Sequence, residues 1–341
     1  MGGSCCVLAA ALALSLALAG VFLALGGTSP LSALSVLLHG AFGSRHALED
    51  CVLKAIPIYL CALGVAVAFR LKIWNIGAEG QFALGAIGAT WAALTFPELP
   101  KVALLPLMAA MAMAAGGLWG LVPAILRQRL RTNEIIVTLM MNYIAVLLLD
   151  YLVYGVWKDP TSFGFPMTPL FSDAAIIGRI GGTTINWGLA HGLVLGLLVW
   201  AFFRFTRTGF AVLAGGDNVR AARYAGLPYD RLVFLVMVAS GALAGWAGFV
   251  EASATVNRLQ PSIMVGYGYT AIVVAWLARL HPLAIGVAAL LLAGLRVGVE
   301  NLQLDLQVPA AFGGIIEGAI LLTVLAGGFF TTYRFTRRKR P

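Results

Sequence analysis

Residues 204–231 read RFTRTGFAVLAGGDNVRAARYAGLPYDR and interrupt a long apolar sequence with a polar, basic segment. The apolar runs on either side, residues 186–205 and 232–250, are each long enough to cross a bilayer as a helix. The segment carries five arginines, Arg204, Arg207, Arg220, Arg223 and Arg231. Because basic loops between spans stay on the cytoplasmic side, this stretch predicts a cytoplasmic loop in a helical membrane protein.

The same loop is predicted to contain a short helix. The pair Gly215-Gly216 indicates a turn, and Asp217 or Asn218 can cap a helix over residues 219–225. Gly226 is suited to ending that helix, because glycine readily adopts the left-handed conformation that follows helices. Two interpretations remain open: a solvated connector that only obeys the positive-inside rule, and a docking helix for a cytoplasmic partner.

Composition extends the membrane interpretation to the whole chain. The 341 residues are 60% hydrophobic and 11% charged, with a mean hydropathy of +0.92. A soluble domain carries about 25% charged residues. A β-barrel would show alternating segments of about ten residues, and the sequence shows none. We therefore expect an all-α, polytopic membrane bundle in the lipid bilayer.

We expect ten membrane-spanning helices in a single transmembrane domain that covers residues 1–341. The predicted spans are residues 5–27, 51–69, 76–94, 102–126, 134–154, 186–205, 232–250, 264–277, 282–299 and 308–330. Residues 31–42 are predicted to lie along the outer interface, and residues 155–185 to form an outer loop. An even number of spans and the basic tail, residues 333–341, place both termini in the cytoplasm. This topology explains the net charge of +9 without nucleic acid.

Glycines four residues apart recur in the predicted spans. Small residues at this spacing let membrane helices approach closely, so the pairs together predict a tight bundle. The pairs are Gly116/Gly120, Gly192/Gly196, Gly241/Gly245, Gly294/Gly298 and Gly314/Gly318.

Motifs for catalysis, nucleotide hydrolysis or metal binding are missing from the sequence. It contains no Gly-Lys pair and therefore no phosphate-binding loop, and it contains no HExxH motif. Its four cysteines lack metal or disulfide spacing. We predict no catalytic residue, no metal and no cofactor, which disfavours an integral membrane enzyme. An ion-coupled carrier stays open, because Gly266 and Gly268 interrupt a span and suggest a broken helix.

Two groups of polar residues fall within the predicted spans. Asn75 and Glu79 are four residues apart and share a face if the segment is helical. Glu79 is either a helix N-terminal charge at the interface, which the helix dipole favours, or a functional group. Glu134, Thr138 and Asn142 form one polar stripe on an apolar helix. That stripe serves either hydrogen bonds between helices or the lining of a transport path, and we favour the second.

Four blocks of the sequence together resemble a known family. They are NIGAEGQFA at residues 75–83, NEIIVTLMMNYIAV at 133–146, AGGDNVRAARYAGLPYDRL at 214–232 and VGYGYTAIVVAWLARLHPLAIGVA at 265–288. In this order, from about residue 50 to the C-terminus, they resemble permease subunits of bacterial ABC importers in the ribose, branched-chain amino acid and nucleoside group. The fourth block is most similar to nucleoside-type permeases that work with a basic membrane lipoprotein, although Trp276 is bulkier than that resemblance leads us to expect.

The resemblance implies a transport subunit with several partners in the bacterial cytoplasmic membrane. They are a cytoplasmic ATP-binding subunit, a second homologous permease in a heterodimer, and an extracytoplasmic substrate-binding lipoprotein. The implied solute is a nucleoside or a related small polar molecule, with a simple sugar as the alternative and an ion-coupled carrier as a further one.

The resemblance also assigns residues by position. The implied ATPase-coupling residues are Asp217, Asn218, Arg220, Arg223, Tyr224 and Gly226. The implied residues of the translocation path are Asn75, Glu79, Gln81, Asn133, Glu134, Thr138, Asn142 and Tyr267.

Overall fold

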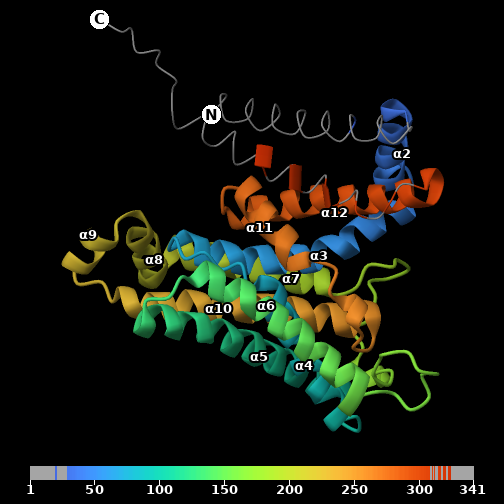
Figure 1. Ribbon diagram of the computed structural model, residues 1–341, viewed down its shortest axis with the longest axis horizontal. Coiled ribbons are helices and arrows are strands. Elements are labelled where there is room, and N and C mark those ends of the chain that lie inside the picture. Colours follow the sequence, from blue (N-terminus) through green and yellow to red (C-terminus); the bar gives the residue numbers. More distant parts are fainter. Residues whose placement is uncertain are drawn as a thin grey trace, which may run out of the picture. The chain divides into compact units, whose positions relative to one another are not determined.

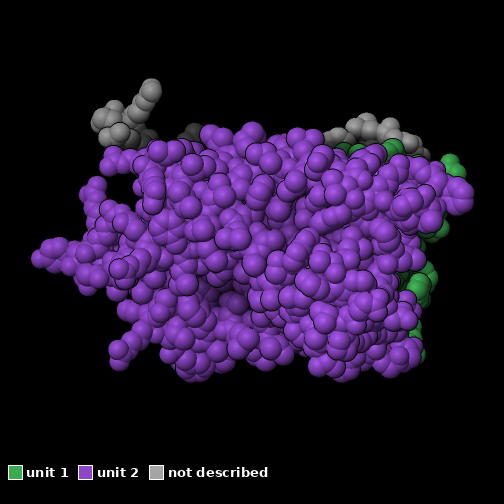
Figure 2. Space-filling view, turned by 90° about the horizontal axis from the view of Figure 1, so that it is seen from below, with its two compact units in different colours: residues 1–51, 291–341 green, residues 52–290 purple. Residues whose placement is uncertain are grey.

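A computed structural model describes residues 29–307, together with residue 20 and isolated positions between 309 and 323. Every regular element in this part of the chain is helical (Figure 1), and its strand-type pairing is confined to one isolated bridge between Arg179 and Asn186. The expectation of an all-α protein is confirmed for these residues. The chain divides into two compact units, residues 52–290 and residues 1–51 with 291–341 (Figure 2).

The unit of residues 52–290 contains most of the helices. They are most of α3 (Arg45–Arg70), α4 (Ala78–Thr95), α5 (Lys101–Leu130), α6 (Glu134–Tyr151), α7 (Gly188–Phe205), α8 (Arg207–Asp217), α9 (Val219–Tyr224), α10 (Tyr229–Val250), α11 (Tyr267–Leu277) and the start of α12 (Pro282–Leu306). The π-helical turns η1 (Leu152–Val156) and η3 (Glu251–Val256) continue α6 and α10, and the 3-10 turns are η2 (Asp173–Ala175) and η4 (Pro261–Ile263). The other unit contains α2 (Pro30–Phe42), the start of α3 and the rest of α12.

Six of the described helical segments are long and apolar enough to cross a membrane, which indicates a multi-pass membrane protein. They are Arg45–Arg70, Lys101–Leu130, Glu134–Val156, Gly188–Phe205, Tyr229–Val256 and Pro282–Leu306. The predicted third span corresponds to α4, and the predicted eighth span to the broken segment that contains η4 and α11. The first and tenth predicted spans and the basic tail lie almost wholly outside the described residues, so ten spans and cytoplasmic termini remain predictions.

The centre of the 52–290 unit is formed by α4, α5 and α10, which pack closely on one another. Gly116 of α5 faces the backbone of α10: a Cβ there would overlap the carbonyl oxygen of Gly241 and lie 2.9 Å from the Cα of Gly245. Gly120 faces the Met237 carbonyl oxygen in the same way. The close approach predicted from Gly116/Gly120 and Gly241/Gly245 is therefore confirmed.

Three glycines of the other pairs make room for side chains. Gly192 and Gly196 of α7 receive the ring of Tyr59, and Gly294 of α12, in the second unit, receives Phe42 of α2. Gly298 of α12 instead faces the helix backbone of α2, at the carbonyl oxygen of Leu37. The Gly314/Gly318 pair lies in residues 308–323, of which the structure describes only single positions.

The helices of the 52–290 unit differ in how deeply they are buried. In the most apolar 18-residue stretch of each helix, 83% of the residues of α3 are buried, whereas only 22% of those of α7 are. The exposed residues of α7 include Leu193, Val194, Leu197 and Leu198. An outward apolar face is what a bilayer requires of a spanning helix, so α3 is an interior helix and α7 a peripheral one.

Between η1 and α7 the backbone is mostly irregular, as predicted for residues 155–185. The hydroxyl of Ser253 donates to the carbonyl oxygen of Ala175, and the Ile177 N–H donates to the Ser253 carbonyl oxygen at 3.0 Å. At the other end of the loop, hydrogen bonds from the backbone and hydroxyl of Thr161 lower the pKa of the Asp159 carboxyl. The loop is thus ordered by contacts to η3 and by local turns.

Candidate functional site

Buried polar side chains gather where α4 begins. Asn75 lies in the non-helical segment before α4, and its amide Nδ2 donates to Gln81 Oε1 at 2.9 Å and to Ser240 Oγ at 2.8 Å. Its Oδ1 accepts from the Gly77 N–H at 3.0 Å and from Gln81 Nε2 at 3.2 Å. Asn75, Gln81 and Ser240 are at most 1% exposed. The helical register considered for Asn75 and Glu79 is wrong, because the helix starts only at Ala78.

Asn142 of α6 reaches the same point of the fold. Its Oδ1 accepts from the Gly80 N–H at 2.9 Å, and its Nδ2 donates to the Ile76 carbonyl oxygen at 3.0 Å. The Nδ2 group also lies 3.2 Å from the Tyr269 hydroxyl on α11. One amide therefore joins α6 to the first turn of α4 and to α11.

The rest of the polar stripe on α6 is also buried. The Thr138 hydroxyl donates to the Glu134 carbonyl oxygen at 2.7 Å and accepts from the Ile76 N–H at 3.3 Å. Glu134 forms an ion pair with Arg127 of α5. Asn133 is exposed and caps α6 by accepting from the Ile135 N–H at 2.9 Å. The stripe thus faces protein, with Thr138 placed against the start of α4.

Glu79 lies in the first turn of α4 and is only 3% exposed. Its Oε1 accepts from the Gly266 N–H at 2.9 Å, and its Oε2 accepts from the Gly268 N–H at 2.6 Å. Gly268 packs so tightly on Glu79 that a Cβ would lie 2.6 Å from the Glu79 Cα. The carboxylate is therefore buried in protein at the N-terminus of a helix, and its depth in the membrane remains a prediction.

Most of the residues predicted for the path meet in a single region, which we call the polar cluster: Asn75, Glu79, Gln81, Thr138, Asn142, Ser240, Tyr267 and Tyr269. Tyr267 is 6% exposed and packs edge-on against Phe82, with ring centroids 6.0 Å apart. Sequence reasoning missed Ser240 and Tyr269, although a lone hydroxyl in the apolar run of α10 was a visible signal. Contact of the cluster with a solute remains a prediction.

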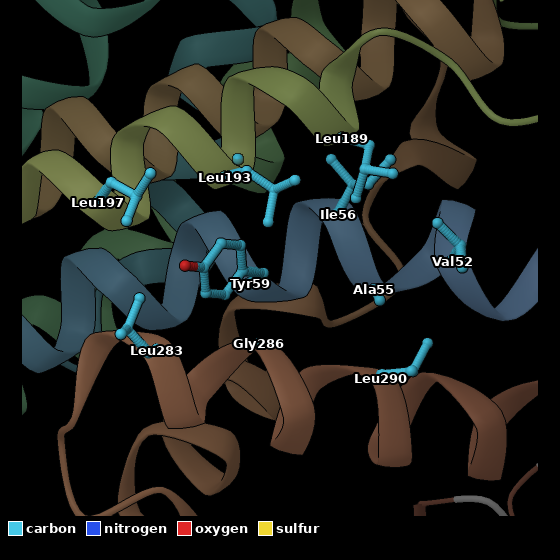
Figure 3. Close-up of a pocket in the computed structure, with 11 residues that line it drawn as sticks. Val52, Ala55, Ile56, Tyr59, Leu189, Leu193, Leu197, Leu283, Gly286 and Leu290 are labelled. Atoms are coloured by element: carbon cyan, nitrogen blue, oxygen red, sulfur yellow. The ribbon is translucent and has the colours of Figure 1, made fainter. Parts of the chain in front are cut away.

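An apolar cleft, separate from the polar cluster, opens between α3, α7 and the start of α12, with a volume of about 420 Å³. Figure 3 shows Leu189, Leu193 and Leu197 on one side, Leu283, Gly286 and Leu290 on the other, and Tyr59 between them. Its lining carries no charged side chain. Such a lining suits hydrocarbon and not a polar solute.

The basic loop folds as two consecutive helices, α8 and α9. Thr206 caps α8 by accepting from the Gly209 N–H at 2.9 Å. Asn218 caps α9 by accepting from the Arg220 and Ala221 N–H groups, both at 3.0 Å, and Gly226 follows α9 with a φ of +77°. The short helix and its cap are therefore confirmed. The turn predicted at Gly215-Gly216 is wrong, because both glycines lie inside α8.

α9 presents most of its surface to solvent. Ala222 is the one buried residue of its six, whereas Tyr224 is 97% exposed. Arg223 pairs with Asp230 at 3.0 Å and lies 5.5 Å from the ring centroid of Tyr229, so α9 is tied to the start of α10. Asp217, Arg220 and Gly226 are also exposed. The predicted coupling residues are thus all accessible, in α9 or in the residues just before and after it.

The described residues hold no group of three His, Cys, Asp or Glu side chains that could bind a metal ion. The polar cluster offers hydrogen bonding, and docking at α9 remains a prediction.

Comparison with known proteins agrees with this description. The model of the family described as branched-chain amino acid transport system / permease component matches residues 47–325. A glucose ABC transporter permease protein of Haloferax volcanii is 34% identical over 331 residues, which cover 94% of this chain and 87% of that protein. A guanosine ABC transporter permease protein of Bacillus subtilis is 32% identical over 325 residues, with 92% and 91% covered. A nucleoside ABC transporter permease protein of Lactococcus lactis subsp. cremoris is 30% identical over 310 residues, with 87% and 84% covered.

The family match and the similarity to these relatives over most of their length support the same family assignment. Residues 47–325 include all the spans of the 52–290 unit, the polar cluster and α9. Permeases of this family are membrane subunits of ABC importers and not themselves enzymes. The chain therefore belongs to the family of permease components of branched-chain amino acid transport systems, and within it to the group that contains nucleoside and sugar permeases.

Proposed function

We propose that the chain forms, with a second homologous permease, the path by which a nucleoside or a related small polar solute crosses a bacterial cytoplasmic membrane. The observation that carries the proposal is α9, a capped and exposed helix between two long spans. A permease of an ABC importer works with an ATP-binding subunit and a substrate-binding protein. Since the chain has no phosphate-binding loop, a separate subunit must deliver the energy of ATP to it.

The chemistry of the polar cluster supports an uncharged solute. The Glu79 carboxylate is engaged by two backbone N–H groups of α11, so its charge is already compensated. The cluster otherwise offers amides and hydroxyls, from residues such as Asn142 and Tyr269. These groups can exchange hydrogen bonds with sugar hydroxyls and base edges, whereas a charged solute would require a counter-charge.

A simple sugar is the second candidate, because the glucose permease relative is as similar to this chain as the guanosine one. Both solutes present hydroxyl groups, but only a nucleoside adds an aromatic base. The external substrate-binding lipoprotein is the component that would select between them.

The test is uptake by the assembled complex in proteoliposomes with its own binding protein. We expect ATP-dependent accumulation of labelled guanosine or uridine, and competition by other nucleosides. Accumulation of glucose with no competition by nucleosides would replace the first candidate by the second. Accumulation of neither would reject the proposed solute class.

A further inference from the structure

The connection between α3 and α4, residues 70–79, which we call the elbow, contacts both ends of α11. At the C-terminal end, Arg70 donates from Nε and Nη2 to the carbonyl oxygen of Leu280, at 3.1 and 2.8 Å. Leu280 lies in the turn after α11, where Arg279 and Leu280 have φ values of +50° and +59°. A planar guanidinium that gives two hydrogen bonds to one carbonyl oxygen fixes the position of that turn.

The N-terminal end of α11 is bound by the other end of the elbow. Glu79 accepts the hydrogen bonds from Gly266 and Gly268 described above. A carboxylate at the N-terminus and a guanidinium near the C-terminus both oppose the dipole of α11, so the two charges stabilise the helix in this place. The elbow therefore reaches both ends of α11 and places at each end the charge that the helix dipole favours.

Aromatic packing joins the elbow to α11 between these two ends. The rings of Trp74 and Trp276 are stacked, with centroids 5.6 Å apart and an interplanar angle of 28°. Phe69 at the end of α3 lies 5.1 Å from Trp74 and 6.0 Å from Trp276, measured between ring centroids. Three separate contacts along one short helix leave little freedom for α11 to move without the elbow.

The opposite side of the elbow touches the helix that leads to α9. Gly216 of α8 packs directly on the carbonyl oxygen of Arg70, and a Cβ at Gly215 would lie 2.9 Å from Leu71 Cδ1. The Arg70 guanidinium also lies 4.5 Å from the ring centroid of Phe203 on α7. Asn218 alone separates α8 from α9, so α9 is connected to the elbow through α8.

α11 begins at the polar cluster, within a span that is broken. Gly266 has a φ of +85°, and the 3-10 turn η4 precedes it. The first turn of α11 carries Tyr267, which packs on Phe82, and Tyr269, which lies against Asn142. Irregular backbone at membrane depth is tolerated where it lies within protein or lines a cavity, and broken helices form solute sites in many transporters.

We propose that the elbow and α11 form one rigid coupling unit, which passes a movement of α9 through Arg70 to the polar cluster at the start of α11. In this view Arg70 is a positioning residue and touches no solute. The inference rests on the proposed function, since it requires an ATPase at α9 and a solute path at the polar cluster.

The first test measures solute imported per ATP hydrolysed by the assembled complex in proteoliposomes. For Arg70→Met we expect assembly and ATP hydrolysis to persist while the ratio falls by about tenfold, which lies within the 5–150-fold effects typical of coupling between sites. Arg70→Lys keeps the charge but offers only one donor direction. Its ratio of solute imported to ATP hydrolysed should therefore lie between those of Arg70→Met and the unsubstituted protein. Arg129→Met is the control, since Arg129 is an exposed arginine at the end of α5. An unchanged ratio for Arg70→Met would overturn the inference.

A second test replaces one contact by a covalent link. In a background without the four natural cysteines, Trp74→Cys and Trp276→Cys place a thiol on each side of the stacked pair. If the elbow and α11 move together, a disulfide between these two residues should leave uptake within about twofold of the reduced complex, because a link that favours neither of two states shifts no equilibrium. Uptake that stops on cross-linking would overturn the rigid unit.

The two tests separate this inference from the proposed function. An unsubstituted complex that imports neither nucleosides nor sugars argues against the solute class and leaves the coupling unit to be tested with the solute that it does import. A complex that imports normally, with an unchanged ratio for Arg70→Met, argues against the coupling unit alone.

Discussion

Asn142 shows how much of this fold depends on single side chains. Its amide serves a backbone N–H, a backbone carbonyl and a tyrosine hydroxyl, at 2.9, 3.0 and 3.2 Å. Two of these partners, Gly80 and Ile76, belong to the first turn of α4 and the residues before it. Buried backbone groups that lose their only side-chain partner are costly, because no water is available to replace it.

Asn142→Leu is therefore expected to destabilise the subunit. Loss of the amide leaves the Gly80 N–H without this acceptor, so we expect the free energy of unfolding to fall by about 1–3 kcal/mol. The measurement is denaturant unfolding of the purified protein in detergent, followed in parallel by uptake in the complex. Tyr143→Leu is the control, because Tyr143 is the neighbouring residue and is 59% exposed. Unchanged stability would contradict the structural role that these three hydrogen bonds give to Asn142.

The spacing of Glu134, Thr138 and Asn142 was enough to predict a shared buried face. It could not identify the partner of that face, because the contacts on α4 are backbone groups of Ile76 and Gly80, which any residue type could supply. The pairing of Glu79 with Gly266 and Gly268 was out of reach for a related reason, since almost 190 positions of chain separate the two segments. Side-chain type is read from sequence, but the partner is set by the fold.

At the scale of elements, hydropathy located the long spans, because each must cover a fixed bilayer thickness with apolar residues. Local propensity failed at Gly215-Gly216, which was predicted as a turn and is helical. The absence of a Cβ there serves close packing on Arg70 and Leu71, so tertiary contact decides the conformation and not the flexibility of glycine. The π-helical turns after α6 and α10 also have no signal in the apolar pattern.

Close packing of α5 on α10 gives a prediction for Gly116→Ala. The added methyl group would overlap the carbonyl oxygen of Gly241, and helix backbones cannot move apart without loss of packing elsewhere. We expect a loss of stability of about 1–3 kcal/mol, as is typical of overpacking, seen as a lower Tm in detergent. Gly155→Ala is the matched control, because a Cβ at Gly155 meets nothing within 4 Å. Equal Tm values for both variants would show that the helices are not packed as described.

The exposed face of α9 gives a prediction for the double variant Arg220→Glu with Arg223→Glu. The subunit should insert and fold normally, since both side chains are exposed, but docking of the ATPase should weaken and uptake should be lost. Co-purification of the ATPase and uptake in proteoliposomes measure the two effects. Lys158→Glu with Arg179→Glu reverses two exposed charges of the loop between η1 and α7 and should leave both measurements unchanged. Intact assembly and uptake in the α9 variant would argue that α9 is only a connector.

At the scale of the whole molecule, the proposed division of work gives the chain a membrane path and a docking helix and gives a separate subunit the supply of energy. The family was predicted from four blocks of the sequence and is confirmed by the family match over residues 47–325. The solute is less accessible to prediction, since relatives of similar identity are named for glucose, guanosine and nucleosides. Selection by a separate binding protein leaves no fixed signature in the permease itself.

The most direct test of this division is solute accumulation in proteoliposomes that contain either the permease pair alone or the complete complex. We expect ATP to drive accumulation only in the complete complex, and a proton or sodium gradient to drive none in either. If the permease pair alone concentrated solute at the expense of an ion gradient, it would be an ion-coupled carrier, and the role assigned to α9 would be wrong.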